Sequence, residues 1–135
     1  MSDDSSARFL KKNGELLMQS AEASSDMLMY ARAATGMVGI SIFKDIGNHV
    51  SYQDDLGILA DTVLDFWQGQ LPGNQWDEME YIIRNGKFEA NFIYSDQIDP
   101  EDDILDRRDR AVARVFGRKK IVYSSWDDVG NIFKL

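Results

Sequence analysis

The sequence predicts an α+β fold in a single domain over residues 1–135, with an antiparallel sheet of about four to five strands and three main helices packed on it. Three observations support this fold class. Two segments have apolar residues at helical spacing, and a third segment opens with residues typical of a helix start. A β-hairpin is predicted between the second and the third of these segments. At this length a chain buries enough apolar surface to fold without disulfides or a structural metal.

The first helix is expected from Ala7 to Ala21, because its apolar residues return every three or four positions. Asn13 is a polar residue on the same stripe. Residues 1–7 are expected to be frayed, and residues 22–26 are expected to interrupt the secondary structure. Two short strands follow over 26–33 and 37–44, since apolar and small residues alternate there and two glycines disfavour a helix. The alanines and methionines of this region leave a helix as the alternative. Residues 45–53 form a loop or a third short strand.

The second helix is expected to begin at Asp54 and Asp55, whose charges favour the positive end of a helix dipole. It should end at the glycines and proline of residues 69–74. One apolar stripe runs along it: Leu56, Leu59, Ala60, Val63, Leu64 and Trp67.

A hairpin over Trp76–Tyr94 is predicted most firmly, because Asn85-Gly86 is the preferred central pair of a type I′ turn. This turn places Arg84 opposite Lys87. The same register pairs Ile83 with Phe88, Tyr81 with Ala90, Met79 with Phe92, Glu80 with Asn91, and Glu78 with Ile93. The first three of these pairs form an apolar face, and the glutamates, with Glu89, are expected on a solvated face. Four aromatic residues are expected in the core: Trp76, Phe88, Phe92 and Tyr94.

The third helix is expected to start at Asp99 as the N-cap, with Pro100 in the first turn and Asp102 at the third position. Gly117 is the expected stop, and acidic residues at the start and basic residues at the end suit the helix dipole. A strand follows over 120–123, and the tail 124–135 is expected to pack Trp126, Ile132 and Phe133 in a short helical turn. The buried stripe comprises Ile104, Ala111, Val112, Val115 and Phe116.

Composition excludes several classes of function. The chain has no cysteine, which removes disulfide frameworks and thiolate zinc sites and fits a reducing cytoplasm. A net charge of −8 disfavours direct nucleic-acid binding, which needs a concentrated basic surface. The polar, acidic N-terminus is not a signal peptide, and no apolar run is long enough for a membrane span. We therefore expect a cytoplasmic protein that binds no membrane.

Catalytic chemistry is sparse. His49 is the one histidine and is expected in a loop, so a histidine-pair metal site is excluded. Phosphate-binding and calcium-binding loop patterns are absent from the sequence. A magnesium site from Asp96, Asp99 and Asp103 is the remaining metal alternative. We expect no enzyme activity, no cofactor and no metal.

The segment from Trp76 to Tyr123 resembles the YezG-like family of bacterial immunity proteins. The resemblance comprises a Trp, a strand, Gly-Lys-Phe, an aromatic-rich strand ending at a Tyr near acidic residues, and a charged helix. Ser95 and Gln97 depart from the family pattern. The matching positions are Trp76, Gly86, Lys87, Phe88, Phe92, Tyr94 and Asp96.

The resemblance implies a small α+β cytoplasmic protein that neutralises the C-terminal domain of a cognate polymorphic or contact-dependent toxin, often a nuclease. Its acidic character suits the basic cleft of such a toxin. The alternatives are an acidic interaction module, either an adaptor or an effector chaperone, and a small metal-dependent hydrolase that uses the acids of 96–103. Among these acids, Asp96, Glu101 and Asp103 are those that the helix is not expected to need. The expected toxin contacts are Tyr52, Asp54, Asp55, Asp96, Asp99, Glu101, Asp102 and Asp103.

Overall fold

The computed structural model describes residues 2–20, 26–34, 37–54 and 58–123. Within them the chain forms three α-helices and one sheet of six strands, in the strand order β5-β4-β1-β2-β3-β6. The helices are α1 (Ser2–Ser20), α2 (Ile58–Gln68) and α3 (Ile104–Phe116). The strands are β1 (Met27–Ala34), β2 (Met37–Asp45), β3 (Val50–Asp54), β4 (Glu78–Arg84), β5 (Lys87–Ile93) and β6 (Ile121–Tyr123). The predicted α+β class is confirmed.

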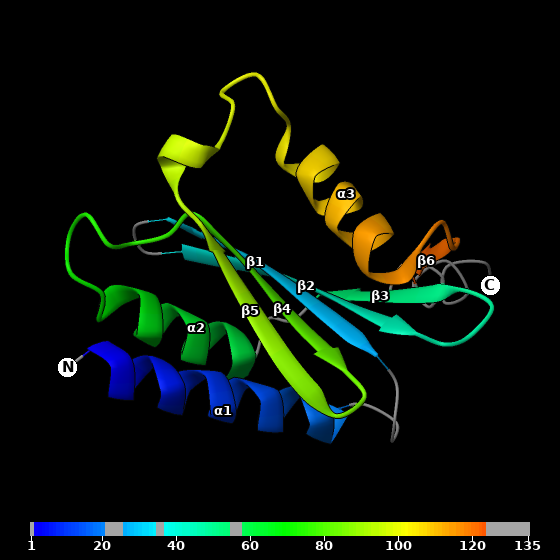
Figure 1. Ribbon diagram of the computed structural model, residues 1–135, viewed down its shortest axis with the longest axis horizontal. Helices are drawn as coiled ribbons and strands as arrows, with labels where there is room; N and C mark the ends of the chain where they lie inside the picture. The colour runs from blue at the N-terminus through cyan, green and yellow to red at the C-terminus, as the bar shows by residue number, and fades with distance from the viewer. Residues whose placement is uncertain (1, 21–25, 35–36, 55–57, 124–135) are drawn as a thin grey trace, which may run out of the picture.

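The sheet is mixed, and it has more strands than expected. β1 to β5 pair antiparallel, whereas β6 pairs parallel with β3, so that Val50 lies opposite Ile121. The parallel pair arises because the chain crosses the whole sheet through α3 before it returns as β6. Figure 1 shows the resulting three layers, with α1 and α2 side by side below the sheet and α3 above it.

Local predictions for the middle of the chain agree with the structure. β1 and β2 match the expected strands to within about one residue, and the region 45–53 contains β3. The hairpin has the predicted register at every pair from Glu78↔Ile93 to Arg84↔Lys87. Asn85 has φ 52° and Gly86 φ 76°, as a type I′ turn requires.

The starts of α1 and α2 differ from the prediction. α1 begins at Ser2 rather than at Ala7, so the expected frayed segment is largely helical. Asp54 is the last residue of β3 and not a helix start, because its backbone pairs with Ser41 of β2. α2 begins at Ile58. Asp55, most of the expected break at 22–26 and the tail 124–135 lie outside the described residues.

Two apolar clusters fill the spaces between the layers. The first joins α1 and α2 to one sheet face and contains Trp76, Tyr81 and the stacked rings of Phe9 and Phe66. The second joins α3 to the other face, through Ala111, Val112 and Phe116. Phe88 was expected in the core but is 50% exposed, because it lies at the outer edge of the sheet beside Tyr81.

Candidate functional site

The segment that joins β5 to α3, residues 94–103, contains five of the eight expected contact residues. We call it the acidic connection. It comprises a 3₁₀ turn, η1 (Ser95–Gln97), followed by a second turn at Asp99–Asp102. In Figure 1 it is the yellow segment that rises from the end of β5 and returns to α3, on the side of the sheet opposite α1 and α2.

Short-range hydrogen bonds fix the backbone of the acidic connection. The Tyr94 N–H donates to the Gln97 side-chain oxygen at 3.0 Å, and the Gln97 N–H donates back to the Tyr94 carbonyl at 2.9 Å. The Asp99 side chain accepts from the Glu101 N–H at 3.0 Å, and its carbonyl accepts from Asp102. The Asp99 turn is an Asx turn, which holds a loop in one conformation. The connection therefore presents its side chains from a defined backbone.

Asp103, and not Asp99, is the N-cap of α3. Its carboxylate accepts from the Leu105 N–H at 2.8 Å, and its carbonyl accepts from the Arg107 N–H. The prediction was wrong because Asp99-Pro100 also has the residues of a helix start, but forms a separate turn. The helix begins four residues later, where Arg107 reaches the sheet. Asp103 is therefore required by the helix, contrary to the expectation, and Asp102 is not its third residue.

The carboxylates of the acidic connection are mostly exposed. Asp96, Asp99, Glu101 and Asp103 are exposed and form no ion pair with any described side chain. Asp102 is partly buried and forms an ion pair with Arg110. Four negative charges in eight positions thus face solvent without a neutralising partner in the described part of the chain.

Two arginines of α3 form ion pairs with glutamates of the sheet, and a third lies over aromatic rings. Arg107 donates from Nε to both carboxylate oxygens of Glu78, at 3.1 and 3.0 Å, and Arg114 pairs with Glu80. Glu78 also accepts a hydrogen bond from the Tyr30 hydroxyl. Arg108 lies over the rings of Phe43 and Tyr52, 5.6 and 5.1 Å from their centroids.

Glu78 and Glu80 were expected to be solvated, but only 2% and 6% of their surfaces are exposed. The strand alternation placed them correctly on the face opposite Tyr81, but it did not show that α3 covers this face. One signal was present in the sequence. Arg107 and Arg114 are seven residues apart, on the same side of the helix as Ala111, and such arginines need buried acids.

These contacts shift the pKa of two groups. Burial and the hydrogen bond to Glu78 raise the pKa of Tyr30 well above its ordinary value. The hydrogen bonds to Glu78 raise the pKa of Arg107. Both shifts favour a neutral Tyr30 and a charged Arg107 across the physiological pH range.

The remaining expected contacts do not belong to the acidic connection: Tyr52 and Asp54 are in β3, and Asp55 lies outside the described residues. Tyr52 is 8% exposed, because Arg108 covers its ring and Phe43 packs beside it, so its expected exposure is wrong. Asp54 ends β3, opposite Ser41, and Ser41 accepts a hydrogen bond from Arg108. The acidic connection is thus the part of the expected surface that the structure brings together.

A polar cavity of about 490 Å³ lies at the base of the acidic connection. Ile98 of the connection borders it, together with Arg32 of β1, Asp77 and the Glu78–Arg107 pair. Arg32 is exposed and lies opposite Glu78 in the register of β1 and β4. Charges of both signs beside this opening suit a polar or charged side chain of a partner.

His49 lies in the bend before β3, where its Nδ1 is 2.6 Å from the Asn48 side-chain oxygen. Over the described ranges, no group of three or more His, Cys, Asp or Glu side chains is arranged to hold a metal ion. Asp96, Asp99 and Asp103, the alternative magnesium ligands, are therefore not gathered into one site. Among the described helices, none has the length and apolarity needed to cross a membrane.

No protein-family model and no curated protein matches this chain.

Proposed function

We propose that this protein is an immunity protein, which binds and neutralises a cognate bacterial toxin domain in a stoichiometric, non-catalytic complex. The toxin domain is basic, as a nuclease is, and the complex forms in the cytoplasm. The sequence resemblance over Trp76–Tyr123 suggests this class of protein, and the acidic connection is the observation that supports it most directly.

The exposed carboxylates are suited to a basic cleft. Asp96, Asp99 and Glu101 lie on a backbone held by its own hydrogen bonds, so little conformational entropy is lost when they bind. A nuclease cleft attracts phosphates with lysines and arginines, and carboxylates of opposite charge accelerate association with such a surface. Fast capture is what an immunity protein needs.

The inner ion pairs of α3 support the same function. Without carboxylate partners, Arg107 and Arg114 would offset the negative charge of the acidic connection and repel a basic partner. Their pairing with Glu78 and Glu80 neutralises these two arginines, so that they do not offset the carboxylates of the connection. The net charge of −8 extends the attraction beyond the contact surface.

The test is co-expression with the toxin C-terminal domain encoded immediately upstream of this gene. We expect that the toxin domain alone arrests growth, that co-expression restores it, and that the purified proteins form a one-to-one complex without toxin activity. Persistent arrest with both proteins present would refute the proposal. An effector chaperone would give a different result, because it would bind the domain and leave its activity intact.

A further inference from the structure

β5 is an open edge of the sheet. It is the first strand in the order β5-β4-β1-β2-β3-β6, so one side of it has no described neighbour. In a two-residue turn the Lys87 N–H bonds to the Arg84 carbonyl, and bonding to β4 then recurs at every second residue. The backbone groups of Phe88, Ala90 and Phe92 therefore point away from β4. A single charge, Glu89, lies between Phe88 and Phe92, which is weak protection for an edge strand.

The sequence of this edge is close to a palindrome. Residues 88–92 read Phe-Glu-Ala-Asn-Phe, with Ala90 at the centre. If two copies of β5 pair antiparallel about Ala90, Phe88 lies opposite Phe92 of the other copy, and Glu89 lies opposite Asn91. Aromatic pairs and carboxylate–amide pairs are favourable across strands, and no like charges lie directly opposite each other. The outward backbone groups of Phe88, Ala90 and Phe92 bond to those of the other copy in the same register.

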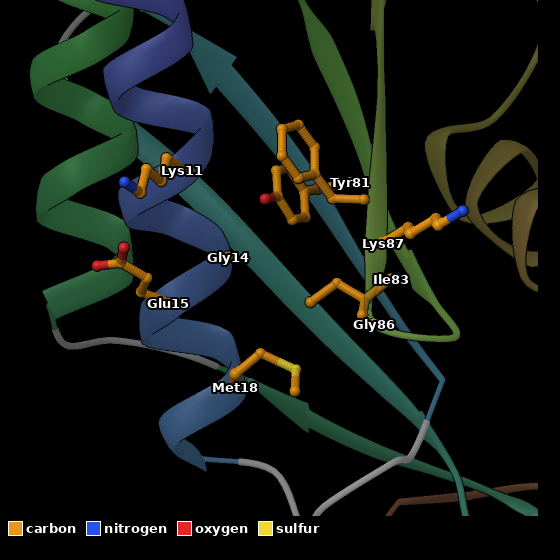
Figure 2. Close-up of a pocket in the computed structure, with 9 residues that line it drawn as sticks. Lys11, Gly14, Glu15, Met18, Tyr81, Ile83, Gly86 and Lys87 are labelled. Carbon is orange, nitrogen blue, oxygen red and sulfur yellow. The ribbon is translucent and has the colours of Figure 1, made fainter.

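An apolar groove borders the same edge. It has a volume of about 230 Å³ and lies between α1 and the β4–β5 hairpin, as Figure 2 shows. Met18 of α1 faces Ile83 and Tyr81 across it. Phe88 and Met18 remain 50% and 41% exposed in the single chain. A strand added to β5 places side chains on the face of Phe88 and removes part of this apolar surface from water.

We propose that β5 of one molecule pairs antiparallel with β5 of a second copy, about a two-fold axis through Ala90, to give a continuous twelve-stranded sheet. This dimer is independent of the proposed immunity function. A second copy fits better than an unrelated strand because the edge is complementary to itself. One short strand pair buries less surface than a standard stable interface, so the dimer should form at micromolar or higher concentrations.

The test is sedimentation velocity of the full chain over a range from low micromolar to near-millimolar concentration. The measured mass should rise from 15.4 kDa towards twice that value as the concentration increases. Ala90→Pro should hold the mass at that of one chain. The Ala90 N–H points away from β4, so the substitution removes no hydrogen bond within the monomer.

Three further variants separate the strand pair from other contacts. Phe88→Glu should also prevent dimerisation, whereas Leu71→Glu, an equally polar change at an exposed apolar residue elsewhere, should not. Asn91→Lys should lower the dissociation constant of the dimer about fivefold, because the two-fold axis creates two pairs in which a lysine lies opposite Glu89 of the other copy. Melting curves establish that each variant is folded.

A wild-type protein that keeps the mass of one chain at every concentration would overturn the dimer. So would a dimer that Ala90→Pro and Phe88→Glu both leave intact. The wild-type protein could instead stay monomeric while Ala90→Pro weakens its binding to the upstream toxin domain. In that case the occupant of the edge is a strand of the toxin and not a second copy. Failure of the dimer leaves the growth-rescue test untouched, because that test depends on the acidic connection.

Discussion

Glu78 of β4 and Arg107 of α3 form a buried ion pair that links the sheet to the helix above it. The Arg107 Nε lies 3.1 and 3.0 Å from the two carboxylate oxygens, and 2% of Glu78 is exposed. Removing the partner of a buried carboxylate costs several kcal/mol of stability, so this pair determines whether α3 packs on the sheet. Because the acidic connection leads directly into α3, the pair also positions the candidate site.

Glu78→Gln should destabilise the protein by about 3 kcal/mol, because it leaves Arg107 without a counterion in a mostly buried position. Chemical denaturation measures the change. Glu89→Gln is the matched control on the same face of the hairpin, and as an exposed residue it should change stability by less than about 0.5 kcal/mol. Equal effects of the two substitutions would mean that the pair with Arg107 contributes nothing.

Asp103→Ala should cost about 1 kcal/mol of stability, because the Leu105 N–H loses its cap. Asp99→Ala affects a turn outside the helix, so its cost should be smaller. The comparison by thermal unfolding decides which aspartate caps α3. A larger loss at Asp99 would support the helix start that the sequence suggested.

Gly14→Ala should be destabilising even though alanine is the better helix former by about 1 kcal/mol. A Cβ at position 14 would lie 2.5 Å from the Tyr81 hydroxyl, which is held by a 2.6 Å hydrogen bond to the Leu10 carbonyl. In a Tyr81→Phe background the obstacle is removed, and the same substitution should become neutral or stabilising. A double-mutant cycle of unfolding free energies measures this reversal, and purely additive effects would contradict it.

Stability should fall at alkaline pH in a way that depends on Tyr81. Burial raises the pKa of Tyr81 from 10.0 to about 12. The folded state therefore favours the neutral phenol. Its contribution is complete below the unfolded pKa of 10.0 and is lost as the pH rises towards about 12. Denaturation at a series of pH values should give a shallower decline for Tyr81→Phe than for the wild type. Parallel curves would show that the phenol has no such linkage.

Charge reversal should locate the toxin-binding surface. Asp96→Lys with Glu101→Lys should slow association with the toxin domain and reduce its salt dependence, because both acids are exposed and unpaired within the described chain. Asp61→Lys with Asp65→Lys makes the same charge change on α2, at the opposite layer, and should have a much smaller effect. Stopped-flow or surface-based kinetics at two salt concentrations measures both variants. Identical effects would indicate long-range attraction without a contact at the acidic connection.

The features that the sequence predicted well are those specified locally. The Asn85-Gly86 turn fixes the register of β4 and β5 without information from the rest of the chain, and Gly117 ends α3 with φ 78° as a helix stop should. The start of α3 was ambiguous, because Asp99 and Asp103 offer the same capping chemistry. Only the contact between Arg107 and Glu78 distinguishes them, and that contact joins residues from different elements.

The candidate site was predicted in part for the same reason. The acids at 96, 99 and 101 are exposed because they belong to a connection between elements, which local composition indicates. Tyr52 is covered because α3 crosses over β3, and the strand sequence contains no information about that crossing. The parallel pairing of β6 with β3 is likewise a property of the whole topology.

The position of β6 has a consequence for synthesis of the protein. β5 and β6 lie at opposite edges of the sheet, and α3 crosses between them, so β6 can pair with β3 only after α3 and the chain through Tyr123 have emerged. Pairings between distant segments form late in folding. On the ribosome, the first five strands can therefore assemble while the acidic connection is still unanchored. Premature termination before α3 should yield a chain in which Glu78 and Glu80 lack their arginine partners.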